Sequence, residues 1–405
     1  MDLRGTNQES GRPYNRRIVL ETIRLHAPIA RAEIARRVGL TIQTVSTITR
    51  ELEALDFVRS AREPRGGRGH PPAMLRLNPE GGFAIGLHVT PIGVEAALVD
   101  LAGNLVARRV NAAAPTDPRA TFAICGALVA EVRALRPDGR MLGIGVAIPG
   151  PVGVEAMSFV GPTTLEGWKD VAIAERIEGA TGLPTFVGID LAAAALGERL
   201  YGAGRDVGDF YYLYFGVGLG GAMVHDGVVL RGAHGNAGEI GHLPLAPDGE
   251  PCPCGNRGCL ELTLSLDALD RRLRTAGVTR DRAIADGHPV FEAWLAEAAP
   301  LLRRAVVVVE NLFDPQTILI GGLAPDALIE RLLAAAGPLP PSVAERSGRV
   351  APRLTLTRGG GDAVLRGAAA LAVSGLLSPR LGTLFREEDR GDPDPVVWRN
   401  REYAT

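Results

Sequence analysis

The chain of 405 residues lacks the features that mark membrane and secreted proteins. No uninterrupted apolar run approaches the roughly 20 residues needed to span a bilayer. The N-terminus (MDLRGTNQESGRPYNRR) is polar and does not resemble a signal peptide. Lysine occurs only once, at Lys169, so nearly all basic side chains are arginine. We therefore expect a cytoplasmic protein with no membrane partner.

The composition is that of a globular protein, with 46% hydrophobic and 22% charged residues. The length predicts two or three domains. Residues 1–80 contain 14 arginines and nine acidic residues, a net charge of +5, so the rest of the chain carries −7 of the total of −2. A basic N-terminal segment indicates a polyanionic partner for that segment. Charge alone leaves a solvated charged face as an equal alternative.

The first eighty residues predict three helices. Residues 15–26 form the first, RAEIARRVG the second, and Thr41 is the predicted N-cap of a third helix that runs to Leu55. Apolar residues at helical spacing predict the buried stripe of the third helix: Val45, Ile48, Leu52 and Leu55. Short polar side chains and one arginine are predicted on its outer face: Gln43, Thr44, Ser46, Thr47 and Arg50.

Such an outer face suits a recognition helix that reaches base edges and phosphates in the major groove. Two predicted strands, FVRSA and AMLRLN, flank the segment REPRGGRGHPP, in which Arg65 and Arg68 lie among glycines and prolines. This segment is a predicted wing that contacts phosphates or the minor groove. Residues 1–80 are thus a predicted winged helix-turn-helix DNA-binding domain. The alternative is a small helical protein-interaction domain with a basic linker.

Beyond residue 80, predicted strands alternate with helices. Phe83 to Leu105 predicts two strands joined by a turn, and LGIGVAI, TFVGID, FYYLYFGVGLGGAMV and TILIGG each predict strand structure. This alternation indicates an α/β domain. Glycine turns after strands, at 216–221 and at Gly321-Gly322, are weak evidence for a phosphate site, because such turns often serve tight geometry alone.

Three of the four cysteines lie within eight residues of one another, in GHLPLAPDGEPCPCGNRGCLE. His242, Cys252, Cys254 and Cys259 together supply three thiolates and an imidazole, a donor set that suits a closed tetrahedral zinc site. A disulfide is disfavoured in a reducing cytoplasm. The sequence therefore predicts structural zinc in the loop 242–259. Cys125, in an apolar helix, is a predicted core residue.

The run GNAGEIGH…CPCGNRGCLE resembles the signature of the ROK family, which groups repressors, open reading frames and sugar kinases. The resemblance covers about residues 82–375, and the N-terminal winged helix is similar to the repressor branch. It implies an actin-like ATPase (ribonuclease H-like), two-lobed α/β fold with a sugar in the cleft. The family's sugar contacts match Asp190, Glu239, His242 and Glu261, and Asp190 corresponds to the kinase general base.

The chain departs from the kinases at the phosphate loop. Where they carry Asp-x-Gly-Gly-Thr, residues 88–92 read His-Val-Thr-Pro-Ile. Proline lacks an N–H donor, and Thr90-Pro91 cannot approach a phosphate as closely as two glycines. Phosphoryl transfer depends on positioned donors and Mg²⁺. We therefore expect no enzyme activity and no ATP requirement, because the phosphate loop of the kinases is absent from His88 to Ile92.

The sugar pocket departs as well. Ile189-Asp190 stands where the family often has Asn-Asp, and Thr164-Leu165 stands where it often has Asn-Leu. Two amide groups are missing, and each lost hydrogen bond to a buried hydroxyl costs about 1–3 kcal/mol. Thr164 remains a predicted ligand contact. We expect a modified sugar, a less polar sugar or another small effector.

The predicted function is a sequence-specific transcriptional regulator, a repressor of carbohydrate uptake or catabolism genes. A homodimer or homotetramer binds a palindromic double-stranded DNA operator, and an effector in the degenerate kinase cleft controls it. The alternatives are an active sugar kinase and a repressor controlled by a protein partner. The predicted domains are residues 1–80, residues 81–378 and a tail, 379–405, which the sequence leaves open between disorder and a packed strap.

Overall fold

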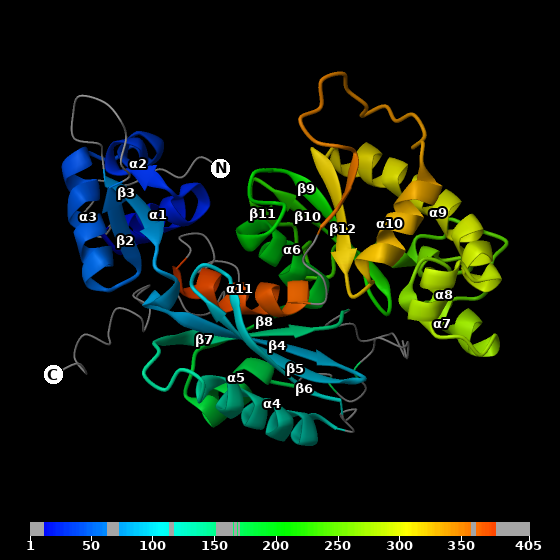
Figure 1. Cartoon of the computed structure of the whole chain (residues 1–405), viewed down its shortest axis with the longest axis horizontal. Coiled ribbons are helices and arrows are strands. Elements are labelled where there is room, and N and C mark those ends of the chain that lie inside the picture. The colour runs from blue at the N-terminus through cyan, green and yellow to red at the C-terminus, as the bar shows by residue number, and fades with distance from the viewer. Residues whose placement is uncertain are drawn as a thin grey trace.

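The structure is a computed structural model that describes residues 12–62, 73–112, 117–150, 165, 168, 171–357 and 362–377. Figure 1 shows three bodies: a small N-terminal domain and two lobes, each built on a sheet, with helix α11 between the lobes. None of the described helices is long and apolar enough to cross a membrane.

The N-terminal domain packs three helices against a three-stranded sheet in which β3 pairs antiparallel with both β1 and β2. Its elements are α1 (Arg12–His26), β1 (Ile29–Ala30), α2 (Arg31–Val38), α3 (Ile42–Ala54), β2 (Val58–Arg62) and β3 (Ala73–Leu77). Gly39 ends α2 with φ 68°, a conformation that glycine adopts at little cost. The Thr41 side chain accepts a hydrogen bond from the N–H of Thr44, which confirms the predicted cap.

The N-terminal lobe contains a five-stranded sheet with the order β6-β5-β4-β7-β8. Its strands are β4 (Phe83–Thr90), β5 (Gly93–Asp100), β6 (Leu105–Asn111), β7 (Met141–Ile148) and β8 (Thr185–Ile189). The 3-10 turn η2 (Pro79–Gly81) leads into this sheet from the first domain. Helices α4 (Pro118–Arg133) and α5 (Ile173–Thr181) share an apolar cluster with one face, and α11 (Ala363–Leu377) packs against β4 and β7.

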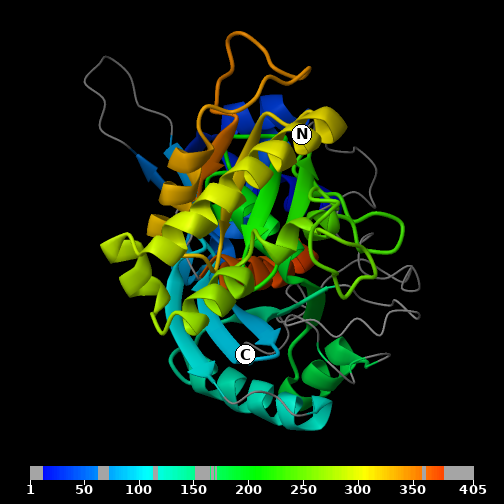
Figure 2. The same cartoon turned by 90° about the vertical axis from the view of Figure 1, so that its right-hand side faces the viewer.

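The C-terminal lobe contains a second five-stranded sheet with the order β11-β10-β9-β12-β13. Its strands are β9 (Phe210–Phe215), β10 (Leu219–His225), β11 (Val228–Val229), β12 (Thr317–Gly322) and β13 (Leu354–Leu356). Its helices are α6 (Asp190–Tyr201), α7 (Leu266–Thr275), α8 (Arg280–Asp286), α9 (Pro289–Phe313) and α10 (Asp326–Ala336). In Figure 2 this lobe, with α7 to α10, faces the viewer.

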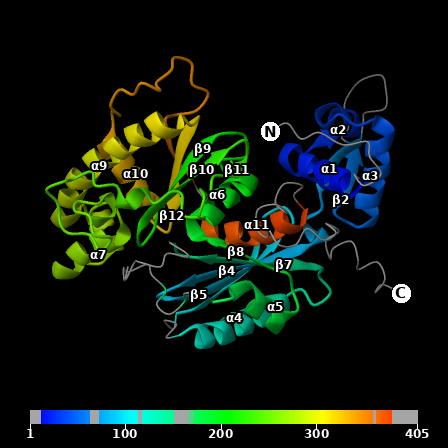
Figure 3. The same cartoon turned by 180° about the vertical axis from the view of Figure 1, so that it is seen from behind.

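Helices α6 and α11 cross between the two sheets, as Figures 1 and 3 show. Glycines allow this close crossing: a Cβ on Gly367 would lie 2.0 Å from the backbone oxygen of Ala193, and a Cβ on Gly197 would lie 3.0 Å from the Cα of Gly367. The backbones of α6 and α11 therefore approach each other directly, and this close packing holds the two lobes together.

Some predicted elements have other bounds in the structure. Helix α1 begins at Arg12, earlier than the predicted residue 15. The run FYYLYFGVGLGGAMV is a hairpin, β9 and β10, rather than one strand, and the Gly216 N–H donates to the Gly218 carbonyl at its turn. Both strands are buried, so the run shows no polar break that would reveal the turn.

Candidate effector site, metal centre and DNA interface

A pocket lies where the C-terminal ends of β7 and β8 meet the start of α6 and the β9–β10 hairpin. Its empty space is about 450 Å³ when the open solvent at its mouth is counted with it. Its lining residues are Pro149, Gly150, Asp190, Leu191, Tyr214, Gly218, Leu219, Gly220, Glu239, His242 and Glu261. The four described residues that the sequence analysis assigned to ligand binding, Asp190, Glu239, His242 and Glu261, are therefore brought together. Thr164 lies outside the described residues.

Asp190 is the first residue of α6, so its carboxylate faces the N-terminal end of that helix. Its Oδ1 accepts a hydrogen bond of 2.7 Å from the N–H of Leu191. Its Oδ2 lies 3.7 Å from Nε2 of His88, whose side chain is only 4% exposed. This Nε2 has no hydrogen-bond partner among the described residues. Residue 88 thus places an imidazole beneath the pocket carboxylate.

Glu239 and Glu261 also line the pocket, and burial raises the pKa of both. Glu261 accepts a hydrogen bond of 2.8 Å from the N–H of Leu219, while the charges of Glu261 and Asp190 further raise the pKa of Glu239. The His242 side chain lowers both pKa values. Several carboxyl groups around one cavity can accept hydrogen bonds from adjacent hydroxyls, which favours a polyol ligand.

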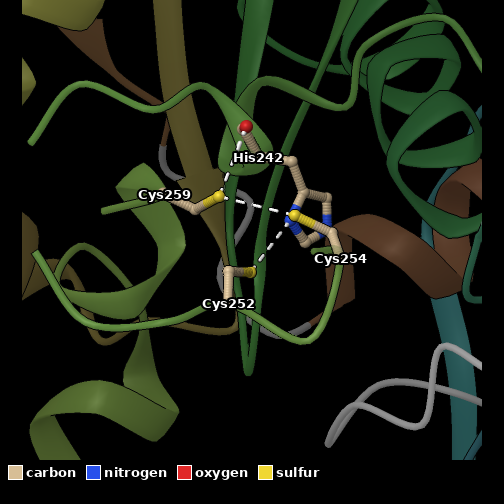
Figure 4. A group of neighbouring side chains, drawn as sticks. All are labelled: His242, Cys252, Cys254 and Cys259. Carbon is tan, nitrogen blue, oxygen red and sulfur yellow. Dashed lines mark hydrogen bonds between the residues drawn. The ribbon is translucent and has the colours of Figure 1, made fainter. Parts of the chain in front are cut away.

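The side chains of His242, Cys252, Cys254 and Cys259 converge on one point, as Figure 4 shows. Their candidate ligand atoms all lie within 4.8 Å of one another, with 3.5 Å between Sγ of Cys254 and Sγ of Cys259. Gly258, at φ 62°, allows the loop to fold back, since a Cβ there would lie 1.4 Å from the Ala246 oxygen. The four donors can therefore hold a metal ion.

His242 belongs to both sites, because it lines the pocket and faces the cysteines. It ends the 3-10 turn η3 (Ile240–His242), and Cys259 directly precedes a second such turn, η4 (Leu260–Leu262), which carries Glu261. The Leu260 N–H donates to the Leu243 carbonyl and joins the two turns. The cysteine loop therefore sets the position of two pocket side chains.

Cys125, the remaining cysteine, is buried in α4, as predicted.

The segment 88–92, which stands where the kinases carry their phosphate loop, ends β4 and forms the turn of the β4–β5 hairpin. The Thr90 hydroxyl donates to the Gly93 carbonyl and accepts from the N–H of Ile92, so the turn uses both groups internally. Beside it, Arg108 bonds both carboxylate oxygens of Glu95 at 2.9 Å and Oδ1 of Asp362 at 3.2 Å. The sequence analysis missed this three-residue ion cluster, because its members lie far apart in the chain.

Helix α3 presents a mixed face to solvent. Gln43, Thr47 and Arg50 are exposed, whereas Thr44 and Ser46 are half-buried, which corrects the prediction that all five face outward. Ile42, which the sequence analysis did not assign to this face, is 58% exposed. Arg65 and Arg68, the predicted wing tip, lie outside the described residues.

A three-helix domain with a β-sheet, joined to two lobes that enclose a carboxylate-lined pocket, defines a winged helix-turn-helix protein with an actin-like ATPase fold. A family model described as "ROK family" matches residues 84–374, and one described as "Winged helix-turn-helix DNA-binding" matches residues 12–59. The chain belongs to the ROK family.

Relatives include both regulators and kinases. The xylose repressor of Bacillus spizizenii is 28% identical, over 76% of this chain and 81% of its own length. A ROK family transcriptional regulator, described as a homologue of the Escherichia coli protein Mlc, superposes with a TM-score of 0.72 at 27% identity, over 93% of this chain and 99% of that chain. The ROK glucokinase of Streptomyces griseus, solved with glucose and AMPPNP, gives 0.61 at 26% identity, over 73% and 100%.

Proposed function

We propose that this protein is a sequence-specific transcriptional repressor of carbohydrate uptake or catabolism genes, released or engaged by a sugar-like effector. One observation carries the proposal: a DNA-reading helix and a carboxylate-lined pocket occur in one chain. The names of its relatives support it, since they include a xylose repressor and an Mlc homologue. The proposed division places DNA binding in residues 1–80 and effector sensing in 81–378, with a tail at 379–405.

Asp190, Glu239, His242, Glu261 and Thr164 are the proposed effector contacts. Carboxyl groups accept hydrogen bonds from hydroxyls, and several of them around one pocket suit the adjacent hydroxyls of a sugar. D-Xylose is the first probe to test, because the chain is similar to xylose repressors. Ile189 and Thr164 stand where the family resemblance implies amide side chains, so sugars with fewer hydroxyls or a substituent are the next candidates.

His242, Cys252, Cys254 and Cys259 are the proposed ligands of a structural zinc ion. Three thiolates and one imidazole fill all four tetrahedral positions, which leaves no open position for catalysis. When bound, the ion would fix the cysteine loop, and with it His242 and Glu261, against the pocket.

We propose that the protein does not transfer phosphate. Pro91 supplies no N–H, and the Thr90 hydroxyl and the Ile92 N–H are used within the turn. Arg108, a cation on the neighbouring part of the sheet, is already paired with Glu95 and Asp362. The turn therefore leaves few free donors for a phosphate, whereas phosphoryl transfer depends on positioned donors. The alternative, a sugar kinase, is favoured by Asp190 and by the similarity to a glucokinase.

The proposed DNA contacts are Ile42, Gln43, Thr44, Ser46, Thr47 and Arg50 on α3, with Arg65 and Arg68 in the wing. A homodimer or homotetramer would present two such domains to a palindromic operator. A second candidate function replaces the small effector with a protein partner, and the altered pocket favours it. Pull-downs from cells grown with and without the inducing carbon source separate the two: a bound partner protein with an empty pocket supports the second candidate.

The decisive experiment selects fragments of sheared host DNA with the purified protein at about 150 mM salt, where nonspecific phosphate binding is suppressed. An enriched palindrome supports the proposal, and sugars related to the neighbouring genes, beginning with D-xylose, are then tested for changing the Kd. No enrichment with or without these sugars overturns it.

A further inference from the structure

The DNA-binding domain is attached to the N-terminal lobe by well-paired contacts. Arg140, the residue before β7, donates a hydrogen bond of 2.6 Å to the carbonyl oxygen of Leu55, the C-cap of α3. The same guanidinium lies 4.9 Å from the centroid of the Phe57 ring. Asn78 donates to the Asp56 carbonyl at 2.8 Å. A cation at the C-terminal end of a helix is stabilising, so this lobe holds the recognition helix firmly.

Apolar packing strengthens the same attachment. Buried residues of α1, among them Ile18 and Val19, belong to one continuous cluster with Leu365 and Val373 of α11 and with Leu142 of β7. Figure 3 shows α1 beside the end of α11 that lies over the N-terminal lobe. Separating these surfaces would expose apolar area to water, so the first domain and the N-terminal lobe move together.

The contact between α1 and the C-terminal lobe is built differently, because cations dominate it. Arg205 donates to the Arg24 carbonyl at 3.5 Å, and Arg199, near the end of α6, is buried beside Arg24. Glu21, which pairs with Arg24 inside α1, is the one buried carboxylate among them, and the exposed Asp206 is nearby.

Two nitrogen atoms at this contact are buried without a hydrogen-bond partner in the described part of the chain: Nη1 of Arg24 and Nε of Arg199. Burial lowers the pKa of Arg199, the Glu21 charge opposes this effect, and the charges of Arg24 and Arg205 add to it. Buried cations that are incompletely paired are costly. This contact therefore opens at a lower cost than the attachment to the N-terminal lobe.

One helix joins this contact to the pocket. Helix α6 begins with Asp190, which lines the pocket, and carries Arg199 two residues before its end at Tyr201. Its 12 residues span about 18 Å at the usual rise of 1.5 Å per residue. A packed helix moves as a unit, so a displacement of Asp190 is carried to Arg199.

We propose that the charged contact of α1 (Glu21, Arg24) with Arg199 of α6 and with Arg205, in the turn that follows α6, is the switch through which the pocket controls the DNA-binding domain. This inference rests on the proposed effector control. The DNA-binding domain stays with the N-terminal lobe and closes onto or separates from the C-terminal lobe as the lobes move. A ligand that favours one lobe arrangement then selects one position of the recognition helix.

The test changes the charge at this contact without touching the DNA-facing surface or the pocket. Arg205→Glu adds an anion beside Arg24 and Arg199 and should tighten the contact, whereas Glu21→Gln removes the buried anion and should loosen it. Arg205 is exposed, so its variant should fold normally even if Glu21→Gln does not. Arg282→Glu, an exposed charge reversal on α8, is the matched control.

Two measurements are made on the full chain, with the operator obtained by selection. Hydrogen exchange of residues 12–26 and 190–206 should slow in Arg205→Glu and quicken in Glu21→Gln. The operator Kd should shift in opposite directions in the two variants, by about fivefold each, while the control matches the wild type. If Glu21→Gln does not fold, slower exchange and a shifted Kd in Arg205→Glu still support the switch.

The proposal is overturned if exchange and Kd in Arg205→Glu match the control, or if exchange changes while the Kd does not. Failure of the wild type to bind any specific DNA would instead overturn the proposed function. In that case the exchange measurement still decides whether these charges hold α1 against α6.

Discussion

Nε2 of His88 lies 3.7 Å from Oδ2 of Asp190, and both side chains are largely buried. His88 is on β4 and Asp190 begins α6, so the pair links the strand that precedes the altered phosphate loop to the floor of the pocket. In the kinases that the chain resembles, an aspartate stands at position 88. Here the His88 imidazole faces the Asp190 carboxylate instead. This arrangement suits a role for the Asp190 carboxylate as a hydrogen-bond acceptor held in a fixed position.

Asp190→Asn should weaken the binding of an effector sugar by about 10- to 100-fold, because a charge-assisted hydrogen bond to a hydroxyl contributes about 1.5–3 kcal/mol. Isothermal titration with D-xylose, and then with the sugars that release the operator, measures the change. Asp281→Asn, an exposed change on α8 outside the pocket, is the control. Equal affinity in Asp190→Asn and the wild type would remove Asp190 from the effector site.

The wild type and His88→Asp should both fail to phosphorylate sugars, since restoring one aspartate leaves Pro91 and the internally bonded turn in place. ADP release in the presence of ATP, Mg²⁺ and D-glucose or D-xylose is the measurement, with an active ROK glucokinase as the positive control. Turnover that disappears in Asp190→Asn would support the kinase alternative.

Cys254→Ser should lose zinc and destabilise the loop that positions His242 and Glu261, because a structural site needs all four ligands. Metal analysis of the purified protein should find one zinc ion per chain in the wild type and little in the variant. Cys125→Ser, on the buried face of α4, should keep the metal. Unchanged zinc in Cys254→Ser would refute the ligand set.

Ile42 should contact a thymine methyl group, because it is an exposed apolar residue at the start of α3, where recognition helices meet base edges. Replacing thymine with deoxyuridine in the selected operator removes only the methyl group. At one symmetric position this should weaken binding about fivefold, roughly 1 kcal/mol, in the wild type. The substitution should have no effect in Ile42→Ala.

Ile92→Ala, which alters an exposed isoleucine outside the first domain, is the matched control. It should retain the full methyl effect. An operator in which no thymine-to-deoxyuridine change distinguishes the wild type from Ile42→Ala would exclude this contact.

Glu198 should make stability depend on pH. Burial raises its pKa above the ordinary value of 4.5, although the Ala203 N–H partly opposes the shift. The folded state therefore holds a proton that the unfolded state releases, and the free energy of unfolding falls as pH rises through that interval. Relative to Glu198→Gln, the wild type should be more stable at pH 5 than at pH 7 in urea unfolding. Parallel pH profiles for the two proteins would contradict this.

Local patterns determined much of what could be read from the sequence. The Thr41 cap, the buried stripe of Val45, Ile48 and Leu52, and the strand–helix alternation all depend on neighbours a few residues apart. The cysteine loop is similar, since its three thiols lie within eight residues. The altered loop at residues 88–92 was also visible, because a missing glycine or N–H is a property of the residues themselves.

Tertiary structure decided which distant groups meet. The apolar stripe of α3 did not reveal that Leu55 is only half-buried. It also did not reveal that the Leu55 carbonyl accepts a hydrogen bond from Arg140, which is 85 residues away in the sequence. Periodicity could not show that the apolar run after Phe210 folds into a hairpin, because both of its strands are buried. The same holds for the Arg108 cluster and for Arg199 beside Glu21. Burial and charge pairing depend on how separate elements pack, and a one-dimensional pattern does not contain that information.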